Sequence, residues 1–153
     1  MTLRFIIFIA LFTWSAGFLL SSIFPDSAYI IIVQPFLKKI YGSVCHQRIE
    51  KTFLLNGHYF LVCARCTGIY LGALVISLIS LFSLPGPTEN FKLLSISAIP
   101  MIIDVTATTT GIYPYSKFIA LSTGLFFGSA VFVYILAVIE NNFVDKPFIN
   151  EPE

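Results

Sequence analysis

Charged residues are scarce in this sequence. Asp, Glu, Lys and Arg make up 11% of its 153 residues, whereas hydrophobic residues make up 57%. A soluble domain carries about 25% charged residues, because much of its surface must face water. The composition therefore excludes an ordinary water-exposed domain and indicates an integral membrane protein whose surroundings are the lipid bilayer. The formal net charge of +1 also argues against a nucleic acid or an acidic substrate as a partner.

Apolar residues instead come in blocks long enough to cross a bilayer. A helix needs about 20 apolar residues to span a hydrocarbon core about 30 Å thick. Four such blocks are present, at residues 3–22, 59–84, 92–111 and 117–139. A fifth segment, residues 27–44, has a shorter apolar run that contains Pro35, and it fits a tilted or broken span, a re-entrant piece or an interfacial helix. The sequence thus predicts an all-α fold, a polytopic transmembrane helix bundle with four or five spans.

The chain is short enough for a single membrane domain. We expect residues 1–140 to form one transmembrane helical domain with a Cys/His-containing loop at about residues 44–58. Residues 141–153 are polar and contain proline, and we expect a disordered tail there. The first apolar block has the basic start of a signal peptide, but it is long and no small-x-small cleavage site follows it. We therefore expect a retained helix.

Lysine and arginine near the span ends predict the orientation, because cytoplasmic loops carry an excess of them. Four spans with the N-terminus outside place six of these residues inside and three outside. Five spans with the N-terminus inside place seven inside and two outside. Four spans with the N-terminus inside reverse the excess, to three inside and six outside. Both favoured arrangements put the Cys/His segment on the cytoplasmic side of the membrane.

Cysteine is also scarce, and its placement is informative. The three cysteines lie with both histidines in the stretch VCHQRIEKTFLLNGHYFLVCARCTGIYLG, as Cys45-His46 and Cys63-x-x-Cys66. Two cysteines three positions apart on a helical turn can direct both sulfurs to one point. Cys45 and His46 would complete the four ligands of tetrahedral zinc, and cytoplasmic thiols stay reduced. The sequence predicts a Cys3His zinc site at the membrane interface, structural or ligand-binding, with His58 as an alternative fourth ligand.

The same thiols also fit a redox centre. Thiol pKa values fall at helix N-termini and beside cations, and Arg65 lies between Cys63 and Cys66. The alternative function is therefore a membrane thiol–disulfide oxidoreductase that uses the CxxC, with Cys45 as an exchanging thiol and a quinone as acceptor. Covalent haem is disfavoured because no histidine follows the CxxC. Cysteines that only pack at a helix entrance are a further alternative, although their concentration in one stretch argues against it.

Asp104 is a charge within an otherwise apolar block. Such a charge costs several kcal/mol unless it is paired or in water. We expect Asp104 to face the bundle and to pair with Arg65 or with a metal-centred site. Together with Arg48, Arg65 and Tyr70 it would line a polar pocket that fits a small anionic or lipid-like ligand. Because arginine binds phosphate well, a third candidate function is a metal-dependent enzyme on a lipid-like phosphate substrate, and whether the chain is an enzyme stays open.

Two pairs of glycines stand four positions apart in the apolar blocks. Gly68 and Gly72 form one GxxxG pair, and Gly124 and Gly128 form the other. Such pairs allow helix backbones to approach closely, so we expect them to serve helix packing. A second copy of the chain or another membrane protein also stays open as a partner.

The Cys/His stretch resembles the signature of DUF2085, a family of small prokaryotic membrane proteins of unknown function. The family pattern is C-H-x-R-x-x-R-S-F, a spacer with glycine, and V-C-x-R-C-x-G-I-Y-x-G. The matching residues are Cys45, His46, Arg48, Phe53, Gly57, Val62, Cys63, Arg65, Cys66, Gly68, Ile69, Tyr70 and Gly72. Later in the chain, Asp104 and Thr123-Gly124 correspond to a membrane Asp and a Thr-Gly-rich span. The departures are Lys51 for Arg, Thr52 for Ser, and Lys117 and Ala120 where the family has an Asn and an Arg. The resemblance implies a multi-pass protein of the prokaryotic inner (plasma) membrane and brings no established activity.

Overall fold

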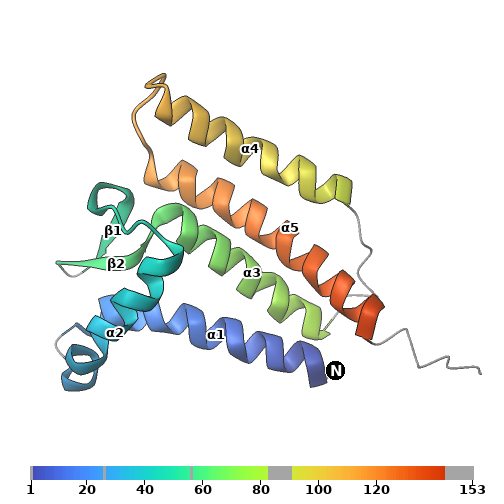
Figure 1. Cartoon of the computed structure of the whole chain (residues 1–153), viewed down its shortest axis with the longest axis horizontal. Helices are drawn as coiled ribbons and strands as arrows, with labels where there is room; N and C mark the ends of the chain where they lie inside the picture. The colour runs from blue at the N-terminus through green and yellow to red at the C-terminus, as the bar shows by residue number, and fades with distance from the viewer. Residues whose placement is uncertain (1, 26, 56, 83–90, 144–153) are drawn as a thin grey trace, which may run out of the picture.

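Helices α1, α3, α5 and α4 lie side by side in that order, and a hairpin and α2 lie at one end of them (Figure 1). The structure is a computed structural model that describes residues 2–25, 27–55, 57–82 and 91–143. In chain order the elements are α1 (Thr2–Ile23), α2 (Ala28–Val44), the 3₁₀ turn η1 (Ile49–Lys51), β1 (Thr52–Leu55), β2 (His58–Cys63), α3 (Ala64–Phe82), α4 (Phe91–Thr109) and α5 (Lys117–Phe143).

Four of these helices, α1, α3, α4 and α5, are long and apolar enough to cross a membrane. Large apolar side chains cover their outer surface, for example Phe12 on α1, Phe82 on α3 and Ile103 on α4, all of them exposed. Such a surface is stable where hydrocarbon replaces water as the solvent. The predicted helical membrane bundle is thereby confirmed.

Helix α2 differs from the other four. It has 17 residues, with Pro35 inside it, so it is about 26 Å long, shorter than the hydrocarbon core. It is one continuous helix rather than two pieces, and it lies across the end of α1 next to the hairpin (Figure 1). Of the interpretations of residues 27–44, an interfacial or re-entrant helix fits this length best.

The observed helix boundaries agree with three of the four predicted spans to within a few residues. The exception is the span expected from residue 59, because α3 begins only at Ala64. The preceding residues, His58–Cys63, form β2 and pair antiparallel with β1. Aromatic and β-branched residues favour a strand, and Gly57, with a φ of 80°, supplies the left-handed conformation that a tight turn needs. The second part of the predicted Cys/His loop, from Thr52 on, is therefore a hairpin.

The hairpin is anchored to the bundle on two sides. Thr52 pairs with Cys63 at its base, and the Lys117 ammonium at the start of α5 donates to the Thr52 carbonyl at 2.6 Å. On the other side, the Ser22 hydroxyl of α1 donates to the Tyr59 carbonyl at 3.4 Å. These contacts hold the last residue of β2 at the entrance of α3.

The predicted glycine pairs meet each other between α3 and α5. A methyl group added at Gly68 would collide with the Leu121 carbonyl, and one at Gly72 with the Leu125 carbonyl. In the opposite direction, a methyl group at Gly124 would collide with the Arg65 carbonyl, and one at Gly128 with the backbone of Ile69. The two backbones thus touch along both GxxxG faces, which sets the axial register of α3 against α5.

An ion pair joins the helices at the opposite end of the bundle. The Arg4 guanidinium of α1 contacts the Glu140 carboxylate of α5 at 2.5 Å and donates to the Ser80 carbonyl of α3 at 2.8 Å. Residues 141–143, which were expected to belong to a disordered tail, are instead the last residues of α5. Residues 144–153, and the predicted turn at 84–87, lie outside the described residues.

We expect Gly128→Ala to destabilise the bundle by about 2 kcal/mol, because its methyl group would force α5 away from the Ile69 backbone. Unfolding in detergent, followed by the loss of helical circular dichroism, would measure it. The matched control is Gly42→Ala on α2, where the added methyl group would lie 3.5 Å from the Gln47 side chain, an ordinary contact. Equal unfolding midpoints for the two variants would contradict a close α3–α5 packing.

Candidate metal centre

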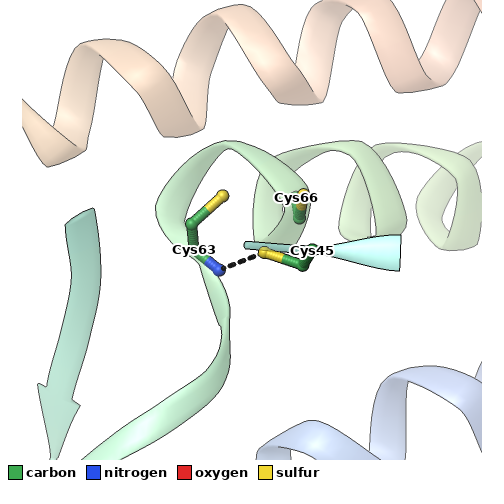
Figure 2. A group of neighbouring side chains, drawn as sticks. All are labelled: Cys45, Cys63 and Cys66. Atoms are coloured by element: carbon green, nitrogen blue, oxygen red, sulfur yellow. Dashed lines mark hydrogen bonds between the residues drawn. The ribbon is translucent and has the colours of Figure 1, made fainter. Parts of the chain in front are cut away.

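Three thiols gather at the hairpin end of the bundle. The Sγ atoms of Cys45, Cys63 and Cys66 all lie within 4.8 Å of one another (Figure 2). Each comes from a different element: Cys45 directly follows α2, Cys63 ends β2, and Cys66 lies in the first turn of α3. The group therefore forms only where these three elements meet.

The backbone around Cys45 directs its sulfur toward α3. The Cys45 N–H donates to the Tyr41 carbonyl at 2.9 Å, which closes the last turn of α2. Its Sγ then accepts the Cys63 N–H at 3.2 Å (Figure 2). The first N–H groups of a helix have no partner within it and favour negative charge. The sulfur of Cys45 thus occupies a position at the start of α3 where a thiolate is stabilised.

Hydrogen bonds within the group favour one ionised thiol. The thiols of Cys63 and Cys66 donate to the Cys45 sulfur, and this holds the pKa of Cys45 well below its ordinary value, although burial opposes the shift. Cys45 itself is almost completely buried. A thiolate is the form that binds metals and attacks disulfides, so this arrangement suits either chemistry.

Neither histidine belongs to the group. Among the described residues, the three thiols alone form it. Cys45 has extended backbone (φ −142°, ψ 136°), and successive side chains of extended backbone point in opposite directions, so His46 is directed outward and is exposed. His58 is exposed at the far end of β2, five positions from Cys63 and on the other face of the strand. The structure brings together three of the four predicted metal ligands and leaves His46 apart.

The loop after Cys45 is held in this conformation by Gln47. Its backbone has a positive φ of 46°, and its amide donates to the Leu61 carbonyl at 2.8 Å and to the Lys38 carbonyl at 3.2 Å. These bonds tie the loop to β2 and to α2, and they keep His46 on the outside. Gln47 was not among the predicted site residues, since its role depends on the tertiary contact with β2.

The expected pairing of Asp104 with Arg65 is present beside the thiols. Arg65 Nη2 lies 2.5 Å from Asp104 Oδ2, and Asp104 is only 3% exposed. The Tyr113 hydroxyl donates to the other carboxylate oxygen, so both oxygens of Asp104 are engaged. Sequence reasoning missed Tyr113, which lies in the turn between α4 and α5. Arg48, by contrast, is exposed.

Aromatic rings close the group on the membrane side. Tyr70 lies one turn after Cys66, and its ring centroid is 5.9 Å from that of Trp14 and 6.0 Å from that of Phe18. The Tyr41 ring lies 6.0 Å from Phe18, and its hydroxyl donates to the Trp14 carbonyl at 2.5 Å. Tyr70 thus serves as part of an apolar wall that separates the sulfurs from the middle of the membrane.

The separations suit a thiolate-bound metal. Zinc–sulfur bonds of about 2.3 Å in a tetrahedron place sulfurs about 3.8 Å apart, so a shift of about 1 Å would bring the thiols to zinc-binding distance. Each Sγ atom moves when its cysteine side chain rotates about χ1, and such a rotation suffices for that shift. The donor set therefore fits a soft metal ion.

Comparison with known proteins agrees with the membrane assignment. A family model described as "Predicted membrane protein (DUF2085)" matches residues 45–134. An uncharacterized protein of Methanocaldococcus jannaschii is 36% identical over 107 residues, 67% of this chain and 67% of that protein. An uncharacterized protein of Methanothermobacter thermautotrophicus is 39% identical over 83 residues, 54% of this chain and 75% of that protein. No solved structure matches the chain.

Removing one partner of the Arg65–Asp104 pair should cost more than removing both. Asp104→Leu leaves the Arg65 guanidinium without its carboxylate, and we expect a loss of about 3 kcal/mol in unfolding free energy. The double variant Arg65→Met/Asp104→Leu should recover most of that loss, because no unpaired charge remains. Detergent unfolding of both single variants and the double variant gives the coupling energy. Strictly additive losses would show that the pair contributes no mutual stabilisation.

Proposed function

The chain belongs to the DUF2085 family of predicted membrane proteins, and from that premise we propose that it is a metal-binding membrane protein whose Cys45, Cys63 and Cys66 thiolates hold one zinc ion. The observation that carries the proposal is the approach of the three sulfurs, from three separate elements, to within 4.8 Å. Buried cysteines that only pack have no reason to converge from α2, β2 and α3 on one point.

Zinc fits the chemistry of this donor set. Thiolates are among its commonest protein ligands, and helix α3 stabilises the negative charge that they carry. Because the protein supplies three ligands, a fourth tetrahedral position is left for a water molecule or a small anionic ligand, the pattern of zinc sites that bind other molecules. The exposed orientation of His46 supports this three-thiolate set over the Cys3His set.

The metal would also have a structural effect. Helix α2 contacts the bundle mainly through Tyr41 and through the loop that Gln47 holds. A zinc ion bound by Cys45, Cys63 and Cys66 would cross-link the end of α2 to the hairpin and to the start of α3. Loss of the metal should therefore loosen α2 first, since the other helices are packed independently of the thiols.

We propose further that the thiol end faces the cytoplasm of a prokaryotic cell. With α1, α3, α4 and α5 as four spans, the arrangement with the N-terminus outside leaves six lysines and arginines on the thiol side and three on the other. The positive-inside rule supports this orientation. A cytoplasmic site would also keep the thiols reduced and free to bind metal.

A thiol–disulfide oxidoreductase is the second candidate. The observations that favour it are the hydrogen bond from the Cys63 N–H to the Cys45 sulfur and the position of the Cys63 and Cys66 sulfurs within 4.8 Å of each other. Oxidation of Cys63 and Cys66 to a disulfide would release two electrons and two protons to a membrane quinone. The third candidate, a metal-dependent enzyme on a lipid-like phosphate substrate, is less well supported, because Arg65 is already paired with Asp104.

Metal content and thiol titration of the purified protein test these functions. We expect about one zinc per chain in the unmodified protein, and loss of zinc in Cys45→Ser and in Cys63→Ser, because each removes one of three ligands. His46→Ala is the matched control and should keep its zinc, since the imidazole lies outside the sulfur group.

Two outcomes would contradict the proposal. Loss of zinc in His46→Ala would restore the Cys3His set and with it a saturated structural site. A metal-free protein in which only Cys45 reacts with a thiol reagent before reduction, and all three cysteines react after it, would favour the redox centre.

A further inference from the structure

A groove lies between α1 and α2, apart from the thiols. It has a volume of about 710 Å³, and its lining is almost wholly apolar. Small residues of α1, among them Ala10, Ala16 and Gly17, leave the space, and Val33 and Leu37 of α2 form the opposite wall. The groove has the size of sites that hold drug-sized apolar ligands.

The position of the groove in the membrane limits what can fill it. Its α1 wall runs from Ala10 to Ser21, about 16 Å at the rise of an α-helix, which is about half of the hydrocarbon core. The wall therefore extends from the middle of the membrane to the end of α1 where the hairpin lies (Figure 1). This length and depth match a single lipid chain within one leaflet.

Two lysines lie in the second half of α2, beside the groove. Lys38 and Lys39 stand between the lining residues Leu37 and Ile40, and both are exposed. The ion pairs of the described residues are Arg4–Glu140 and Arg65–Asp104, so no carboxylate of the described chain neutralises either lysine. They precede Cys45 by less than two helical turns, and Gln47 bonds both the Lys38 carbonyl and the Leu61 carbonyl of β2, so this part of α2 lies beside the hairpin.

We propose that an anionic membrane lipid binds here, with one chain in the groove and its phosphate at Lys38 and Lys39. The charge favours this occupant over a second copy of the chain. A second copy would bring its own uncompensated lysines to the same end, whereas an anionic headgroup neutralises them. The proposal is independent of the metal site, since no thiol contributes to the groove.

Trp14 provides a direct test, because it lines the groove and is the single tryptophan of the chain. Its fluorescence is measured in lipid nanodiscs that contain a small fraction of phosphatidylglycerol or phosphatidylcholine with brominated chains, which quench indole on contact. We expect the brominated phosphatidylglycerol to quench Trp14 at an about 25-fold lower fraction than the brominated phosphatidylcholine, because each of the two lysines favours an anionic headgroup about fivefold. Each of Lys38→Gln and Lys39→Gln should reduce that preference about fivefold.

Two controls make the result specific. Lys92→Gln removes the same charge at the start of α4, on the opposite side of the membrane, and should leave the preference unchanged. Ala16→Leu narrows the groove and should weaken quenching by both lipids. Equal quenching by the two lipids in every variant would overturn the proposal in favour of ordinary bulk lipid. Absence of quenching by either lipid would overturn it in favour of a groove covered by protein.

Discussion

The backbone contact between α3 and α5 is the constraint on which the rest of the structure depends. Glycine at four positions lets the two helices touch, and each glycine lies against a carbonyl or backbone atom of the other helix. Such a contact allows little sliding, because any axial shift would place a side chain where only a hydrogen atom fits. It therefore fixes the level at which α3 begins relative to α5. The Lys117 bond to Thr52 then holds the hairpin at that level.

The sulfur group follows from this arrangement of helix ends. β2 runs directly into α3, so Cys63 and Cys66 are placed by the same turn, and Cys45 arrives from α2 on the other side. At this point the unpaired N–H groups of α3 stabilise negative charge, and Tyr70 with Phe18 keeps the site apart from the membrane interior. A metal held there would join the end of α2 to the hairpin and to the start of α3. Structural and ligand-binding roles are therefore compatible in one site.

Charged side chains within the bundle form ion pairs near its two ends. Arg4 with Glu140 joins α1 to α5 at one end, and Arg65 with Asp104 joins α3 to α4 at the other. Helix α4 packs chiefly against α5, so the Arg65–Asp104 pair is its main polar link to α3. Because Arg65 stands inside the CxxC, this link also connects the sulfur group to α4. The uncompensated lysines, in contrast, lie on α2, where lipid headgroups can reach them.

Composition and block length alone determined that this chain is a helical membrane bundle, because so apolar a surface has no stable place in water. Local spacing also determined the GxxxG packing faces, since these depend only on positions within one helix. The approach of Cys63 to Cys66 needed the turn from β2 into α3 as well. Tertiary structure decided the rest. Only in the folded chain does α2 end where Cys45 meets the other thiols. His46 points outward there because the backbone at Cys45 is extended, and the Tyr113 hydroxyl comes within hydrogen-bond reach of Asp104. The physical reason is that sequence spacing sets which side chains share a face, whereas packing sets which faces meet.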